Sequence, residues 1–219
     1  MNAFPGSGRS GPSAAITLLI VTVVAYFIQM SAFTDVIRLF ALWPLGTPGT
    51  INLGDGTTLS TGFGVWQLVT YGFLHGGLAH LFFNMFALYM FGLPIERAWG
   101  TSRFLQFYFV CMIGAGLVQL GVAQLAGEIY PTIGASGAVF GLLLAFGMMF
   151  PNSRIMLLFP PIPMRAKWFV IGYGVLTLVF GVTGTMPGIA HFAHLGGMLF
   201  GLVMILYWGR QDFQRRRRG

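Results

Sequence analysis

The sequence predicts an all-α polytopic membrane protein. Of the 219 residues, 56% are hydrophobic and only 8% are charged, and the mean hydropathy is +0.77. This composition lies far outside the usual range for soluble domains. Only helices and closed barrels satisfy their own backbone hydrogen bonds in hydrocarbon, and the apolar runs here are continuous instead of alternating as barrel strands do. We therefore expect a bundle of helices.

Six apolar runs are long enough, or nearly so, to cross a hydrocarbon core, which takes roughly 20 helical residues. They cover residues 14–31, 77–95, 103–126, 134–150, 167–184 and 187–208. The first run follows a short segment, residues 1–13, and no convincing small-residue cleavage site accompanies it. We expect it to be a retained helix and not a signal sequence.

The positive charges predict the direction of each helix, because short cytoplasmic loops are enriched in Lys and Arg. With a cytoplasmic N-terminus, Arg38 is the one basic residue on the outer side. The inner side then holds Arg9, Arg97, Arg103, Arg154, Arg165, Lys167, Arg210 and Arg215 to Arg218. This split predicts an even number of spans with both termini cytoplasmic. We expect an integral protein of a bacterial inner membrane.

Three parts of the chain are distinguished by composition. Residues 1–13 form a short N-terminal segment, residues 14–209 one membrane domain, and residues 210–219 a basic cytoplasmic tail that lies near anionic lipid. Within the domain, the connection over residues 32–76 is long, lies outside and shows no strong helical pattern. Loops of this size are usually functional. The Trp, Phe and Leu content of this one predicts that part of it lies in the outer membrane interface.

Polar side chains gather at one depth of the predicted bundle. The second, fourth and sixth runs all enter from the outer face, and early in them lie His80 and Asn84, Ser136, and His194. A histidine inside a span is costly and is a functional hypothesis by default. A serine beside an imidazole is a nucleophile beside a general base. We predict Ser136 as nucleophile and His194 as base, with a supporting or interfacial role for His191.

His80 and Asn84 are four residues apart and share a helix face. They either seal a helix contact or donate hydrogen bonds to a developing oxyanion. Beside a Ser/His pair we favour the second role.

Glycines surround the predicted pair. In the run 134–141 alone, a packing motif is the better interpretation, since small residues let membrane helices approach. Glycines on the sixth run match those on the fourth, which lets the short serine side chain reach the imidazole. The predicted close-packing positions are Gly134, Gly137, Gly141, Gly197 and Gly201.

Several other readings are less favoured. A metal site among the four histidines lacks carboxylate or thiolate ligands at that depth, so we expect neither metal nor other cofactor. The net charge of +7 follows topology and does not indicate nucleic acid. A small-solute transporter would continue its polar path inward and show inverted symmetry.

Two further residues are assigned structural roles. Cys111 is expected only to fill space in the apolar interior, and Glu96 is expected to form an ion pair with Arg97 and Arg103 or to cap a helix.

Together these residues resemble the rhomboid family of intramembrane serine proteases. The similarity lies in Gly134-Ala135-Ser136-Gly137, in His75-x-x-x-x-His80-x-x-x-Asn84, in Glu96-x-x-x-Gly100, in Phe159-Pro160-Pro161-Ile162-Pro163 and in Ala193-His194-Leu195-Gly196-Gly197. It covers nearly the whole chain, and the order of the motifs is more specific than any one of them.

The resemblance implies a six-helix rhomboid bundle that cleaves single-pass membrane proteins in or near their transmembrane region, with the active site open to the outer face. It implies a dyad of Ser136 and His194, and an oxyanion hole of His80, Asn84 and the Ser136 backbone N–H. It also implies a lateral entrance for the substrate helix, with Phe169 and Phe83 as gate residues. The alternative within the family is an idle relative that binds membrane clients; the presence of Ser136 and His194 argues against it.

Two positions depart from the expected family pattern. Phe140 stands where some members carry tyrosine, and its ring is still able to pack against His194. Gln67 stands where an arginine is frequent, which questions how the outer loop is anchored.

Overall fold

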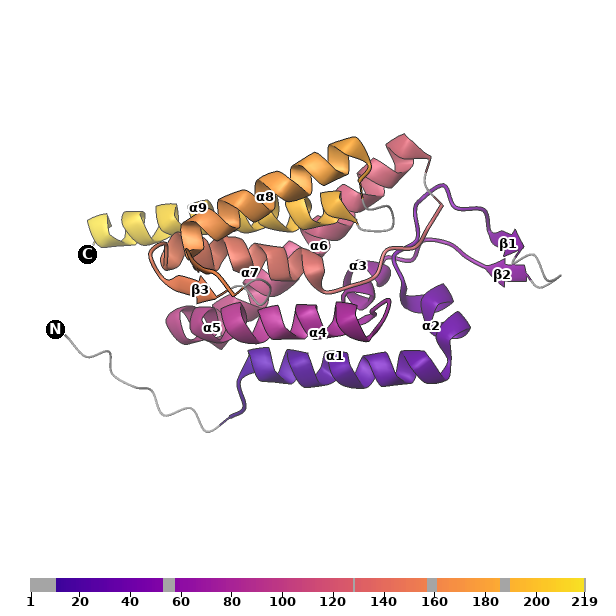
Figure 1. The fold of residues 1–219 in the computed structure, drawn as a ribbon, viewed down its shortest axis with the longest axis horizontal. Coiled ribbons are helices and arrows are strands. Elements are labelled where there is room, and N and C mark those ends of the chain that lie inside the picture. Colours follow the sequence, from indigo (N-terminus) through magenta and orange to yellow (C-terminus); the bar gives the residue numbers. More distant parts are fainter. Residues whose placement is uncertain (1–10, 53–57, 128, 157–160, 186–189, 219) are drawn as a thin grey trace.

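The computed structural model describes residues 11–52, 58–127, 129–156, 161–185 and 190–218. The described residues are mainly helical, as predicted, with two small antiparallel hairpins, of which β1–β2 projects from the bundle and β3–β4 lies against it (Figure 1). Arg9, Phe159 and Pro160, all named in the sequence analysis, lie outside the described residues, as do the side chains of Arg215 to Arg218.

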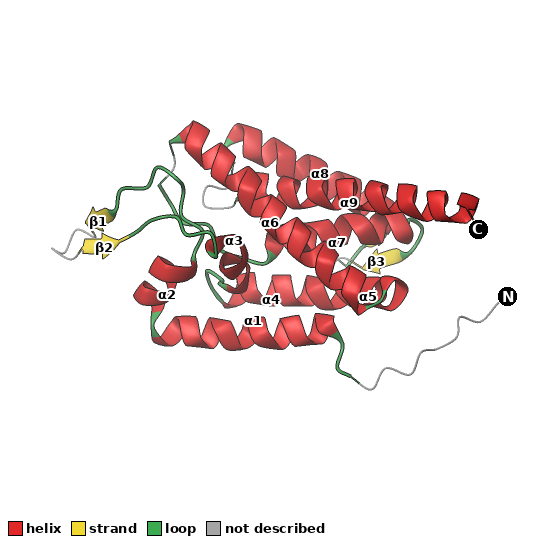
Figure 2. Ribbon diagram, turned by 180° about the vertical axis from the view of Figure 1, so that it is seen from behind, coloured by secondary structure: helices red, strands yellow, loops and turns green. Residues whose placement is uncertain are grey.

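The long helices run side by side, and the start of α1 and the end of α9 lie at the same end of the bundle (Figures 1 and 2). The helices are α1 Ala14–Ser31, α2 Phe33–Phe40, α3 Gln67–Thr70, η1 Tyr71–Phe73, α4 Leu78–Ala87, η2 Leu88–Gly92, α5 Leu93–Trp99, α6 Thr101–Ala126, α7 Ser136–Met149, α8 Ala166–Thr183 and α9 His191–Arg218. The strands are β1 Thr50–Asn52, β2 Thr58–Ser60, β3 Arg154–Met156 and β4 Pro163–Arg165, paired β1 with β2 and β3 with β4.

Among the described residues, five helical stretches are long and apolar enough to cross a membrane, and they correspond to five of the six predicted runs. The run predicted over residues 134–150 forms α7, which has 14 residues and a length of roughly 21 Å. The last predicted run corresponds to α9, which begins at His191 and continues as helix to Arg218, through the segment predicted as a separate tail; the first three residues of the prediction, 187–189, lie outside the described residues. The run 77–95 is one continuous helical stretch, α4, η2 and α5, with a π-helical turn at η2.

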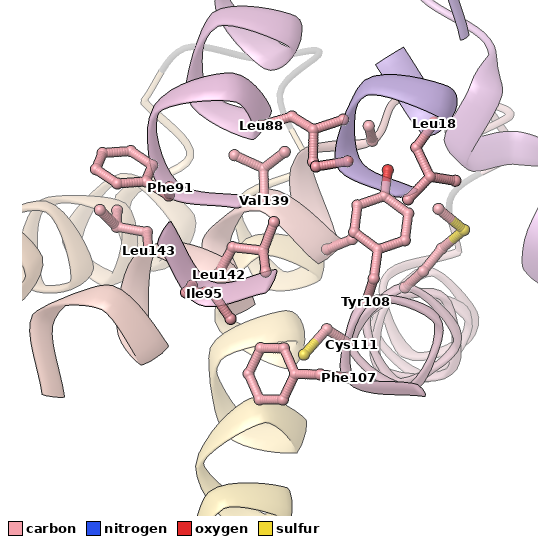
Figure 3. Close-up of a cluster of buried hydrophobic side chains, with 14 of the residues drawn as sticks. Leu18, Leu88, Phe91, Ile95, Phe107, Tyr108, Cys111, Val139, Leu142 and Leu143 are labelled. Carbon is pink, nitrogen blue, oxygen red and sulfur yellow. The ribbon is translucent and has the colours of Figure 1, made fainter. Parts of the chain in front are cut away.

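The helix α7 lies at the centre of the bundle and is buried along most of its length. Figure 3 shows its side chains Val139, Leu142 and Leu143 facing residues of α6 and of the α4 to α5 stretch. From α6, Phe107 and Cys111 complete this core and are fully buried. Helix α8 is more peripheral, because only 17% of its spanning window is buried. The polar residues therefore lie between a buried central helix and a peripheral one.

The connection over residues 32–76, called the outer connection after the side predicted for it, contains short regular elements, although its sequence shows no strong helical pattern. It holds α2, the β1–β2 hairpin, α3 and η1. The α2 segment has exposed Phe33, Leu39 and Phe40, and its eight residues are too few for a clear period in sequence. The hairpin projects from the bundle (Figure 2).

Gln67 anchors this connection, so the question raised by its departure from the family pattern is answered. Its side chain is 1% exposed. Its Oε1 accepts from the Trp43 backbone N–H at 3.1 Å, and its Nε2 donates to the Gly62 carbonyl at 3.0 Å. A neutral amide thus joins two distant parts of the loop.

Glu96 caps α1 and does not pair with Arg103. Its carboxylate accepts the backbone N–H groups of Ala14 at 2.9 Å and Ala15 at 3.1 Å, and also the Ser13 hydroxyl. These N–H groups belong to the first turn of a helix and have no intrahelical partner. Of the two roles predicted for Glu96, the cap is confirmed and the ion pair with Arg103 is not found, because that guanidinium bonds Asp212 of α9 at 3.1 Å.

Candidate active site

Ser136 is the first residue of α7, and the segment before it is held by the outer connection. Thr132 and Leu42 exchange backbone hydrogen bonds of 2.9 and 3.0 Å. The Gly134 N–H donates to the Tyr71 carbonyl at 2.9 Å. Gly134 has a φ of +126°, which a residue with a side chain adopts only under strain. The start of α7 is therefore set by two backbone anchors and one glycine.

The hydroxyl of Ser136 and the imidazole of His194 are in hydrogen-bond contact. The distance from Ser136 Oγ to His194 Nε2 is 2.8 Å. The ring of Phe140 lies parallel to the imidazole, with centroids 4.2 Å apart and an angle of 12° between planes. In the described part of the chain no Asp or Glu hydrogen-bonds to His194, so packing orients its ring.

Glycines bring α7 and α9 together at this depth. A Cβ on Gly197 would collide with the Gly137 carbonyl oxygen, and one on Gly141 would lie 3.1 Å from the Gly197 oxygen and against Cys111. A Cβ on Gly201 would lie 3.5 Å from the Gly141 Cα. The two backbones are thus in contact, which is what lets the short side chain of serine reach the imidazole.

His80 and Asn84 lie on α4, where the Asn84 side-chain N–H donates to the His80 carbonyl at 2.9 Å. Nδ1 of His80 accepts the Gly76 N–H at 3.2 Å. The opposite ring nitrogen, Nε2, faces Gly134, since a Cβ built there would lie 2.9 Å from it and 3.7 Å from Ser136 Oγ. Glycine at position 134 therefore lets the His80 ring approach the start of α7, with its Nε2 edge toward Ser136.

Comparison with known proteins identifies the family of this chain. A family model described as the rhomboid domain matches residues 62–211 of the 219. The chain belongs to the rhomboid family. The resemblance inferred from the sequence motifs is thereby confirmed.

Curated relatives of this rhomboid come from distant organisms. Rhomboid protein 1, mitochondrial, of Saccharomyces cerevisiae is 34% identical over 67% of this chain and 43% of its own length. Rhomboid protease GluP of Bacillus subtilis is 33% identical over 62% of this chain and 24% of its own length. The presenilin-associated rhomboid-like protein, mitochondrial, of Rattus norvegicus is 30% identical over 62% and 36%. The chain therefore spans less than half the length of these relatives.

His75, to which the sequence analysis assigned no role in the rhomboid site, touches His80. Their rings meet edge to face with centroids 4.9 Å apart. His75 is fully buried, neither ring nitrogen has a hydrogen-bond partner among the described residues, and burial lowers its pKa to about 4. On a continuous helix, residues 75 and 80 would point in different directions. The two rings can meet because α4 begins only at Leu78 and the chain before it is not helical.

Gln29 of α1 is a residue that the sequence analysis missed. Its amide is 1% exposed, donates to the His75 carbonyl at 2.8 Å and accepts the His75 N–H at 3.0 Å. The signal was available, because an uncharged polar side chain inside an apolar span needs a partner. It fixes the backbone that precedes α4.

The remaining predicted positions lie around this centre. His191 is buried, and its Nε2 lies 3.1 Å from the Thr185 carbonyl oxygen, which ties the start of α9 to the end of α8. Phe83 is exposed on α4, and Phe169 lies on α8 in a shallow groove. No group of three or more His, Cys, Asp or Glu able to hold a metal occurs in the described residues.

Proposed function

We propose that this rhomboid is an intramembrane serine endopeptidase with Ser136 as nucleophile and His194 as general base. The observation that carries the proposal is the 2.8 Å contact between Ser136 Oγ and His194 Nε2 at the start of a buried helix. An idle client-binding relative has no use for this contact, which needs a glycine at positive φ and helix backbones in contact.

The reaction is acyl transfer. Ser136 Oγ attacks a peptide carbonyl carbon while its proton moves to His194 Nε2. His80 Nε2, the Asn84 amide and the Ser136 backbone N–H stabilise the oxyanion. His194 then gives the proton to the leaving amine as the C–N bond breaks, and water hydrolyses the acyl-enzyme. No metal or other cofactor takes part.

The orientation in the membrane follows from charge. We infer that α7 crosses together with the five longer spans, that residues 1–13 and 210–219 lie in the cytoplasm, and that Ser136 opens to the outer face of a bacterial inner membrane. Support comes from the inner-side excess of Lys and Arg. The start of α1 and the end of α9 also lie at the same end of the bundle (Figure 1).

The substrates are single-pass membrane proteins that enter laterally between α8 and α4, past Phe169 and Phe83. A helix hides its carbonyl groups, so helix-breaking residues near the outer end of the substrate span expose the scissile bond.

The test uses the purified chain in detergent with a single-pass model protein whose outer membrane end carries Gly and Pro. We expect cleavage by wild type and by His191→Ala, and none by Ser136→Ala or His194→Ala. Cleavage that persists in Ser136→Ala would sink the proposal, and inactivity of His191→Ala beside an active His194→Ala would reassign the base.

A further inference from the structure

Four aromatic rings from three helices lie face to face beside the proposed nucleophile. The rings belong to His194 of α9, Phe140 of α7, and Tyr173 and Phe169 of α8. Successive centroids are 4.2, 5.0 and 5.6 Å apart, and successive planes meet at 12°, 20° and 10°. We call this series the ring stack.

One end of the ring stack is buried inside the bundle, and the other end is exposed at its periphery. Phe140 is 5% exposed and lies within the buried helix α7. Tyr173 is 41% exposed and, together with Phe169, lines the shallow groove on α8. The imidazole of His194 is therefore connected by direct ring contacts to the most peripheral part of the bundle.

The orientation of His194 depends on these contacts. Serine proteases commonly hold the base with a carboxylate, whereas none bonds His194 in the described residues. Phe140 covers one face of the imidazole, and Tyr173 covers the other face of Phe140. If Tyr173 loses its ring, Phe140 gains room to tilt away from His194.

We propose that Tyr173 is a positioning residue for His194, acting through Phe140. This inference rests on the proposed function, since it assigns a partner to the proposed base. The ring of Tyr173 performs the role, and its hydroxyl is not needed, because the stacking involves only the ring face. If a bound segment pushed α8 outward, the orientation of His194 would therefore change together with the width of the entrance.

The decisive readout is the rate at which a fluorophosphonate labels Ser136. In this reaction Ser136 Oγ bonds to phosphorus, fluoride leaves, and the proton of the hydroxyl passes to His194 and then to solvent. The probe is small and needs no substrate helix. A residue that only blocks an entrance would, on truncation, leave the labelling rate unchanged or raise it.

We expect Tyr173→Leu to slow the labelling of Ser136 by about tenfold, because small misplacements of catalytic groups are costly. Tyr173→Phe keeps the ring and is expected to label at the wild-type rate. In cleavage of the model substrate, Tyr173→Leu is expected to lower kcat with KM unchanged. If Tyr173→Leu lowers the Tm, Tyr173→Met fills a similar volume without a flat ring and replaces it.

Trp168→Leu is the matched control. Trp168 lines the same groove, but the Lys167 ammonium lies over its ring at 5.5 Å, and it is not a member of the ring stack. We expect wild-type labelling from this variant. Equal slowing in Trp168→Leu and Tyr173→Leu would assign the effect to the groove and overturn the inference.

A double-mutant comparison tests the route through Phe140. The variant with both Phe140→Leu and Tyr173→Leu is expected to label no more slowly than Phe140→Leu alone, because residues in one chain of contacts are not additive. Fully additive losses overturn the inference. If Tyr173→Leu is labelled at the wild-type rate, the positioning role of Tyr173 is overturned and the proposed function stands. If the wild-type protein is not labelled at Ser136, both the positioning role and the proposed function are overturned.

Discussion

The backbone N–H of Gly76 donates to Nδ1 of His80 at 3.2 Å, and this bond determines where the imidazole carries its proton. A neutral imidazole has one N–H, so a ring whose Nδ1 accepts holds the proton on Nε2. Nε2 lies on the edge of the ring that faces Gly134 and Ser136. Neutral His80 therefore points an N–H donor toward the start of α7, where the proposed nucleophile lies.

Removing this donor is expected to slow the chemical step. His80→Phe keeps a flat ring but has no N–H, and we expect kcat to fall by about 10² to 10³, as for other oxyanion donors. KM is expected to stay within about threefold, because the donor acts on charge that develops in the transition state. Gly77→Ala, with nothing within 4 Å of the added Cβ, is the neighbouring control. A His80→Phe variant with wild-type kcat would remove His80 from the proposed oxyanion hole.

The contact between α7 and α9 makes Gly197 intolerant of a side chain. A methyl group there meets the Gly137 carbonyl, which belongs to the backbone and cannot rotate away. We expect Gly197→Ala to destabilise the protein by about 3 kcal/mol, the upper part of the range for overpacking, and to separate Ser136 from His194. The measurements are the Tm in detergent and the cleavage rate.

Gly209 provides the control on the same helix, since an added Cβ there meets nothing within 4 Å. Gly209→Ala is expected to hold or raise the Tm, because alanine favours a helix by up to about 1 kcal/mol. Equal Tm values for Gly197→Ala and Gly209→Ala would contradict the backbone contact.

The cap formed by Glu96 is expected to matter more than the ion pair formed by Arg103. Glu96→Ala leaves the N–H groups of Ala14 and Ala15 without their acceptor, which costs about 1 to 3 kcal/mol per buried group. Arg103→Ala removes a partly exposed pair with Asp212, worth about 0 to 1 kcal/mol. Thermal unfolding in detergent compares the two, and a larger loss in Arg103→Ala would refute the ranking.

Much of this architecture was accessible from the sequence because a membrane restricts the choices. Five apolar runs became long helices, and the family was correctly inferred from ordered motifs. The juxtaposition of Ser136 and His194 followed from shared depth together with glycines on both helices. Depth comes from counting residues along a helix, so it needs no knowledge of tertiary contacts.

What escaped prediction depends on contacts between distant segments. Arg103 has Asp212 as its partner, and Gln67 joins Trp43 to Gly62, neither of which any local period encodes. His75 reaches His80 because the chain before α4 is not helical. Short elements such as α2 carry too few residues for a periodic signal, and their form is set by what they pack against.

Gln67 gives a final test of how the outer connection is held. Gln67→Leu keeps the volume of the side chain, but it leaves the Trp43 N–H and the Gly62 carbonyl without their amide partners. Because Gln67 is 1% exposed, water does not readily replace the lost bonds, and we expect destabilisation by about 1 to 3 kcal/mol. Hydrogen exchange at the Trp43 amide is expected to quicken. Thr70→Val is the control, because the Thr70 hydroxyl also bonds this loop, at the Phe40 carbonyl, but from an exposed position. Unchanged exchange at Trp43 in Gln67→Leu would show that the loop is held by its apolar contacts and not by this amide.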